Sequence, residues 1–266
     1  MENSAKNAGI DQNLSLRLHQ ALTADKDELF CLLAGQPPEV LLAALRNPAL
    51  DEHHLLALLK QRGLPEEVFS AVYAAKRLQV NSAVKFALVI NPETPAHIVS
   101  TLLPQLTLFD LLKICQITGV SPDHRVAAER CIIQRLSSQP LGNKITLARR
   151  GTAAVVDALL REGTPQLMEA CLDNPHLKEG SVHQFITGPT STAETISIVA
   201  RNGRWKSRPN IRLAILKNPR TPAIWFTMLL PGLPQSVLKE ILSAPRLTFA
   251  QKDLVRQAVA GKRPTT

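Results

Sequence analysis

The sequence predicts an all-α protein: a right-handed α-solenoid of short helices that carries an internal duplication, with a period of 127 in residue number and a sub-repeat of about 44. Three observations predict this fold. Of the 266 residues, 45% are hydrophobic but only 4% are aromatic, so the core must consist of leucine, isoleucine, valine and alanine, which suit helix packing. Apolar residues recur at helical spacing between prolines and glycines. Asn-Pro pairs recur at fixed intervals.

The duplication follows from the positions of these Asn-Pro pairs. The segment Asn91-Pro-Glu-Thr-Pro95 recurs as Asn218-Pro-Arg-Thr-Pro222, a shift of 218 − 91 = 127, and Asn47-Pro48 recurs at the same shift as Asn174-Pro175. Sliding Cys31–Ile114 by this shift without a gap places apolar positions on apolar positions through most of the alignment. A duplicated helical array behaves in this way, because each unit buries its apolar face only against its neighbours.

Three helices are expected between the first two Asn-Pro pairs. Asp51–Gln61 carries leucines on one stripe and ends near Gly63, and Glu66–Lys76 opens behind a proline. Asn81 caps the third helix, Ser82–Ile90, which must end before the next proline.

The pattern continues after the second Asn-Pro pair. We expect Thr94 to cap the following helix, with Pro95 in its first turn. Helices at Leu106–Thr118 and Asp123–Leu136 complete the first half.

Three short helices per repeat of about 44 residues resemble α-solenoid proteins of the HEAT and armadillo type, and the repeated Asn-Pro-x-Thr-Pro turn before a Leu-rich helix is similar to bacterial leucine-rich repeat variant proteins. The resemblance covers about Leu29 to Ala260. It implies stacked helices, a curved surface and a binding role, and it implies no particular ligand.

The expected organisation has five parts. They are an N-terminal tail and leading helix at 1–28, a first repeat half at 29–137, a connecting segment at 138–151, a second half at 152–261 and a basic tail at 262–266. The connecting stretch Ser137–Gly151 looks the most irregular, so two independent domains joined by a hinge are an alternative to the continuous array that we favour.

No motif for catalysis or cofactor binding stands out, so we expect a protein that is not an enzyme and needs no cofactor or metal. The four cysteines lie in apolar helical runs without a CxxC pair, which predicts buried, reduced thiols with raised pKa values. The neighbours His53 and His54 lack a third ligand nearby, and a solvated helix start explains them better than a metal site.

The chain ends and the hydropathy pattern indicate a location. Met1–Gln12 is polar without an apolar leader, and no apolar run approaches the roughly 18 residues of a membrane span. We therefore expect a cytoplasmic protein, with Met1–Gln12 and Gly261–Thr266 as frayed tails.

Charge is unevenly distributed along the chain. Met1–Ile133 has 12 Lys and Arg against 14 Asp and Glu, a net charge of −2, whereas Gln134–Thr266 has 19 against 8, a net charge of +11. The stretch Thr195–Lys239, called the basic run below, has no acidic residue. The candidate partner-binding residues in it are Arg201, Arg204, Trp205, Lys206, Arg208, Arg212, Lys217 and Arg220.

These residues favour a non-catalytic interaction or scaffold module that binds an acidic protein partner. A nucleic-acid-binding solenoid is the alternative, in which the cations meet phosphates and Trp205 stacks on a base. An anionic membrane face would suit the same cations. An enzyme acting on nucleic acid is a weaker hypothesis, because the basic run has no catalytic carboxylate. In the plainest interpretation the run is a solvated edge and Trp205 packs as the counterpart of Leu78.

Overall fold

The computed structural model of the protein describes residues 2–75 and 81–261, with side chains from residue 12 onward. All secondary structure in these ranges is helical, which confirms the predicted all-α class. The chain divides into two compact units, Met1–Ile132 and Ile133–Thr266, with the boundary inside α9 (Pro122–Arg135). Within the described ranges no helix is both long and apolar enough to cross a bilayer.

The first unit consists of short helices after one long one. Its helices are α1 (Glu2–Thr23), α2 (Lys26–Leu32), α3 (Pro38–Ala44), α4 (Glu52–Leu58), α5 (Glu66–Ala74), α6 (Ser82–Ile90), α7 (Ala96–Leu102), the 3-10 turn Leu103–Gln105, α8 (Leu108–Gln116) and α9.

The second unit shows a similar succession. After the 3-10 turn Leu136–Ser138, its helices are α10 (Leu141–Arg150), α11 (Ala153–Arg161), α12 (Pro165–Asp173), α13 (Glu179–Thr187), α14 (Ala193–Arg201), α15 (Gly203–Lys206), α16 (Pro209–Lys217), α17 (Ala223–Leu229), α18 (Gln235–Leu242) and α19 (Phe249–Ala260).

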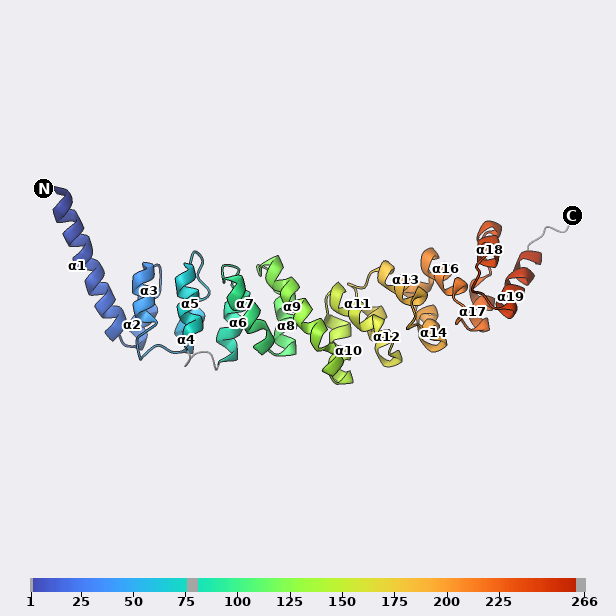
Figure 1. Ribbon diagram of the computed structural model, residues 1–266, viewed down its shortest axis with the longest axis horizontal. Coiled ribbons are helices and arrows are strands. Elements are labelled where there is room, and N and C mark those ends of the chain that lie inside the picture. The colour runs from blue at the N-terminus through green and yellow to red at the C-terminus, as the bar shows by residue number, and fades with distance from the viewer. Residues whose placement is uncertain (1, 76–80, 262–266) are drawn as a thin grey trace. The chain divides into compact units, whose positions relative to one another are not determined.

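Helices contact mainly their near neighbours along the chain. In the first unit α1 packs on α3 and α3 on α5, while α2 packs on α4, α4 on α6 and α6 on α8. In the second unit α10 packs on α12 and α12 on α14, while α11 packs on α13, α13 on α16 and α16 on α18. Figure 1 shows that α13, α16 and α18 lie along one side of the second unit, and α12, α14 and α17 along the other. Leucine, isoleucine, valine and alanine fill the space between these rows.

Helix starts recur at the shift found in the sequence. From α2 to α9, every α-helix of the first unit has a counterpart in the second whose first residue number is higher by 127: α11, α12, α13, α14, α16, α17, α18 and α19, in that order. The short α15 corresponds to residues 76–79, which lie outside the described part of the chain.

Each of the four Asn-Pro asparagines is buried and connects its turn to the helices before it. The amide nitrogen of Asn47 donates to the carbonyls of Ala21 and Ala24, and that of Asn174 donates to those of Ala148 and Gly151, at the same shift of 127.

The second pair of asparagines repeats the pattern. Asn91 Nδ2 donates to the carbonyl of Leu59 and Asn218 Nδ2 to that of Ile186, with donors and acceptors again related by the shift of 127. In all four turns the Oδ1 atom accepts the backbone N–H two residues on. A residue before proline is also driven to extended backbone, so Asn91, Asn174 and Asn218 each end a helix at the position where the side-chain amide finds its hydrogen-bond partners.

One expected cap is wrong. Asn81 caps α6 as predicted, accepting from the backbone N–H of Ala83. Thr94, however, does not cap α7, whose N-cap is Pro95 with no side-chain bond. Its buried hydroxyl donates back to the carbonyl of Leu88, because the turn points the side chain toward the end of α6 and satisfies an orphan carbonyl there.

Three further expectations require correction. The stretch expected to be irregular, Ser137–Gly151, is mostly the helix α10, which packs on α11 and α12. The expected N-terminal tail, Met1–Gln12, is helical from Glu2 because the first turns of α1 continue a segment that is anchored on α3. The tail at 262–266 lies outside the described residues. His54 is fully buried rather than solvated, since it is part of a cap that closes α4.

This cap is a small polar cluster. Asp51 accepts backbone N–H bonds from His53 and His54, and its Oδ2 lies 3.2 Å from the Lys26 ammonium. The ring of His54 places Nδ1 2.6 Å from Asp51 Oδ1 and Nε2 2.8 Å from the Lys26 carbonyl. Burial alone would raise the pKa of Asp51, but the bonds from the His54 backbone, the Lys26 ammonium and the His54 ring outweigh it and hold the pKa at about 2.

We predict that Asn174→Ala lowers the free energy of unfolding by about 1–3 kcal/mol, because the carbonyls of Ala148 and Gly151 lose a buried donor. Urea unfolding followed by circular dichroism measures this. Asn210→Ala, which changes an exposed asparagine, is the control. Equal stability of the two variants would contradict a structural role for the buried amide.

We also predict that Asp51 contributes to acid sensitivity. Because its folded pKa lies below its unfolded value, its contribution is complete above about pH 4 and is lost as the pH falls toward about 2. The urea midpoint of the unchanged protein should therefore fall more steeply between these pH values than that of Asp51→Asn. Parallel pH profiles for the two proteins would contradict this.

Candidate binding surface

Three arginines of the basic run donate to backbone carbonyls in neighbouring turns, and Arg204 and Arg212 do so through two nitrogens each. Arg204 donates from Nη1 to the carbonyl of Asn174 at 2.9 Å and from Nη2 to that of Leu177 at 3.3 Å. Arg212 donates to the carbonyls of Leu229 and Pro231 at the end of α17. Arginine is suited to this task because its planar fork reaches two acceptors together, and helix ends leave carbonyls without partners. The main role of the Arg204 and Arg212 side chains is therefore structural.

Trp205 is not part of the exposed surface, which corrects its place among the candidate partner-binding residues. Its side chain is 2% exposed, and its indole N–H donates to the Leu172 carbonyl at 2.9 Å. The guanidinium of Arg204 lies 4.5 Å from the ring centroid. The indole is therefore enclosed by its own unit and cannot stack on a base, in agreement with the interpretation of Trp205 as a packing residue.

The remaining candidates do not form one patch. Arg201 is exposed and lines a hollow between α12 and α14 together with Glu169 and Glu194. Arg208 lies on the other row of helices, 3.7 Å from Glu179. Lys206 is exposed on α15, and its side chain makes no hydrogen bond or ion pair with a described residue. These cations are close together in the sequence, but the helices that carry them direct their side chains toward different rows of helices.

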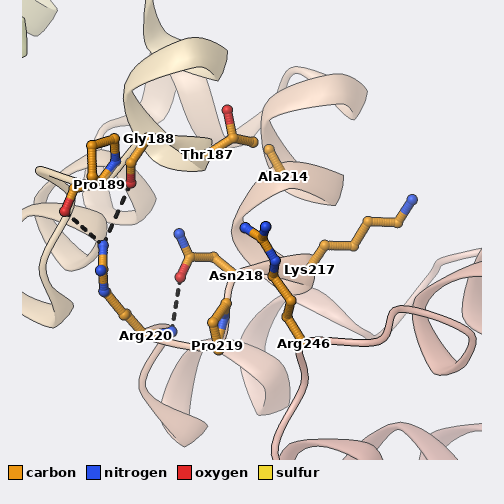
Figure 2. Close-up of a pocket in the computed structure, with 9 residues that line it drawn as sticks. All are labelled: Thr187, Gly188, Pro189, Ala214, Lys217, Asn218, Pro219, Arg220 and Arg246. Carbon is orange, nitrogen blue, oxygen red and sulfur yellow. Dashed lines mark hydrogen bonds between the residues drawn. The ribbon is translucent and has the colours of Figure 1, made fainter.

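Three cations line one further hollow, which we call the basic hollow. It has a volume of about 380 Å³, and it is lined by Thr187, Gly188, Pro189, Ala214, Lys217, Asn218, Pro219, Arg220 and Arg246. No acidic residue is among these, whereas three are cations. It shares Thr187, Ala214 and Lys217 with a larger hollow of about 720 Å³ that follows α13 and α16. Figure 2 shows Arg220 and Arg246 on opposite sides of Asn218.

The cations of the basic hollow retain donors for a ligand. The Arg220 side chain donates to the carbonyls of Pro189 at 2.9 Å and Ser191 at 2.8 Å, but its side-chain bonds to described residues all use Nη1, which leaves Nε and Nη2. Arg246 is exposed and makes no hydrogen bond or ion pair with a described residue. Figure 2 shows its guanidinium directed toward Asn218 and Ala214.

Lys217 is engaged by a weak pair. Its ammonium lies 2.6 Å from Glu240 Oε1, with the two side chains 34% and 50% exposed. Exposed pairs of this kind contribute about 0–1 kcal/mol, so Lys217 can exchange Glu240 for another carboxylate at little cost. Figure 2 shows its side chain extending away from Arg220 and Arg246, which agrees with this pairing.

The sequence interpretation missed Arg246, which follows the basic run. A signal was present: Pro245-Arg246 repeats the Pro219-Arg220 pair of the preceding turn. Both arginines follow a proline and reach the same hollow because successive turns stack on each other.

At the position equivalent to Arg220, the first unit has an acidic residue whose carboxylate is bonded within its own unit. Glu93, the counterpart of Arg220 at the shift of 127, accepts the backbone N–H of Gly63 at 2.8 Å and that of Leu64 at 3.2 Å. Gly63 has a φ of 74°, which turns its N–H toward the carboxylate. An acidic side chain therefore fills the first turn, whereas the matching turn of the second unit presents a cation.

The four cysteines differ in burial, and two of them have raised thiol pKa values. Burial, with a smaller contribution from Glu129, raises the pKa of Cys115 to about 12, and burial with a smaller contribution from Glu162 raises that of Cys171 to about 12, as predicted. Cys31 corrects the prediction that all four thiols are buried: it is exposed, because the short α2 turns it outward. Among the described residues, no group of three His, Cys, Asp or Glu side chains could hold a metal.

We predict that a thiol reagent modifies Cys31 quickly in the folded protein, and Cys115 and Cys171 only after denaturation, because these two are buried and protonated at neutral pH. Absorbance with an aromatic disulfide reagent measures the phases. Cys31→Ser should remove the fast phase, and a fast phase that persists in this variant would contradict the assignment.

Comparisons with known proteins add no relative to this description. No protein-family model matches the chain, and neither a curated protein nor a solved structure matches it. The site is therefore described from the geometry of its own residues.

Proposed function

We propose that this chain is a non-catalytic interaction module, a duplicated α-solenoid whose second unit binds an acidic segment of a protein partner in the basic hollow. Three observations support the solenoid and the duplication: helices pack mainly on near neighbours, helix starts recur at the shift of 127, and the buried asparagines make the same bonds in both units. Arrays of this kind present long surfaces to their partners.

The observation that carries the proposed partner is the cation content of the basic hollow. Lys217, Arg220 and Arg246 line it without an acidic residue, and the last two hold donors that no described residue uses. Carboxylates are the natural acceptors for guanidinium groups, since two N–H bonds can reach two oxygens. The adjoining hollow along α13 and α16 offers room for the rest of a peptide chain.

A polypeptide fits this surface better than a nucleic acid. Single strands bind through aromatic side chains that stack on successive bases. Trp205 and Trp225 are buried, and Phe249 is the only large aromatic side chain exposed on the described part of the second unit. Two of the cations expected to meet phosphates, Arg204 and Arg212, are also held by carbonyls.

We predict that a fluorescein-labelled polyglutamate peptide binds the protein at low salt and that Arg246→Glu weakens this binding by about tenfold, because an unpaired cation becomes a like charge. Fluorescence anisotropy measures the dissociation constant, and a labelled polyglutamine peptide of equal length is the neutral probe.

Arg201→Glu is the matched control, since it changes an exposed arginine by the same charge in a different hollow. Equal losses in both variants would show a general charge effect and would contradict the proposed site. Tighter binding of a labelled oligothymidylate than of polyglutamate, lost in Arg246→Glu, would favour the nucleic-acid alternative. Arg204 is unsuitable for this test because its removal frees carbonyls in the core of the turn.

A further inference from the structure

The first unit carries a groove at the position that matches the hollow along α13 and α16. It has a volume of about 390 Å³ and lies between α4 and α6, with the start of α8 at one end. At the shift of 127, its lining residues Leu56, Lys60, Ala83 and Phe86 correspond to His183, Thr187, Asn210 and Leu213, all of which line the second-unit hollow. The two units therefore place a concave surface at the same point of the fold.

The chemistry of the two surfaces differs. Leu56 of the first unit is replaced in the second by His183, and Ile90 is replaced by Lys217. The helices that carry these residues begin at equivalent positions, α4 with α13 and α6 with α16, although α13 continues two residues further than α4. The first-unit groove has therefore an apolar floor where the second unit has polar and cationic side chains.

Apolar atoms of this floor remain in contact with water. Leu56, Phe86 and Ile90 are all half-buried, between the fully buried core and the exposed surface. A ligand that covers them gains about 25 cal/mol for each Å² of apolar surface removed from water. The aromatic ring of Phe86 adds a large, rigid contact of the type that dominates binding interfaces.

The edges of the groove carry cationic side chains, which favour a ligand with acidic residues. Lys60 is exposed at one edge and makes no ion pair with a described residue. Lys113 stands at the other edge with its side chain 64% exposed, 3.3 Å from Asp110. Asp110 also accepts the hydroxyl of Thr107 at 2.6 Å in the first turn of α8, which holds its charge close to its own helix. A ligand therefore meets a cation on each side of an apolar floor.

The fold restricts the shape of the ligand. The described chain has no strand, so no sheet edge is present to which an extended peptide could add. Polyproline segments need grooves lined by several aromatic rings, and Phe86 is the only aromatic residue in this groove. A groove between two helices accepts a third helix through residues at i, i+3, i+4 and i+7.

We infer that the first-unit groove binds the apolar face of an amphipathic helix of a protein partner, with acidic residues of that helix flanking the face and pairing with Lys60 and Lys113. This site is separate from the basic hollow, and it does not depend on the proposed function of the second unit. The chain would then offer two docking points of different chemistry, one for apolar and one for acidic side chains.

The experiment uses a designed, fluorescein-labelled helical peptide with leucine at i, i+3, i+4 and i+7 and glutamate on both edges. A second peptide carries lysine in place of glutamate, and a third carries glutamine in place of leucine. Anisotropy with the full chain should give micromolar binding of the first peptide and at least tenfold weaker binding of the other two.

The substitutions that test the site replace first-unit residues by their counterparts in the second unit. Leu56→His with Ile90→Lys introduces residues that the equivalent backbone positions already hold, so the fold should survive, and thermal unfolding by circular dichroism checks this. Binding of the first peptide should fall at least tenfold. Lys60→Thr should weaken it about threefold and reduce its salt dependence. The reciprocal control, Lys217→Ile, should leave it unchanged.

Several results would overturn the inference. They are absence of binding by the unchanged protein, a dissociation constant that Leu56→His with Ile90→Lys does not alter, or stronger binding of the lysine peptide. If sedimentation shows that the unchanged protein is a dimer and that the same double variant is a monomer, the groove instead binds a second copy of this chain. If Arg246→Glu loses polyglutamate binding but still binds the helical peptide, the two sites act independently.

Discussion

Buried asparagine side chains connect each Asn-Pro turn to the helices that precede it, and the packing of both units depends on this connection. The amide of Asn174 reaches two carbonyls and accepts one backbone N–H, so its hydrogen bonds are satisfied inside the protein. Proline next to it ends the helix and fixes the direction of the chain. The pair Asn-Pro therefore combines a stop signal with a long-range contact, and it recurs 44 residues apart within each half and at the shift of 127 between the halves.

Arginine has two different roles in the second unit, and the number of guanidinium nitrogens that are bonded within the protein distinguishes them. Arg204 and Arg212 each donate to two backbone carbonyls through two nitrogens, which is a contribution to folding. Arg246 meets no such acceptor among the described residues, and Arg220 uses only one of its nitrogens. A cation count taken from the sequence mixes these roles. The cations with unused donors around the basic hollow, Arg220 and Arg246, are fewer than the seven cations among the candidate residues.

The two units keep the same turns but differ on their surfaces. Glu93 fills the backbone turn at Gly63, whereas Arg220 at the matching position faces carbonyls and leaves a cationic hollow. Ile90 and Lys217 stand at equivalent points of α6 and α16 and give one groove an apolar floor and the other a polar one. Surface positions can change in this way at small cost to stability, because the asparagine bonds and the apolar core lie elsewhere.

The sequence by itself determined the helical class, the repeat shift of 127 and the ends of α6, α12 and α16 before a proline, since these depend on local backbone preferences and on apolar spacing. It also indicated Asn81 as a cap and the raised pKa values of Cys115 and Cys171. Local rules could not show that Thr94 points backward, that Trp205 is enclosed, or that Arg201 and Lys217 face different hollows. Those outcomes depend on which side of a helix meets its neighbours, and only packing in three dimensions decides that.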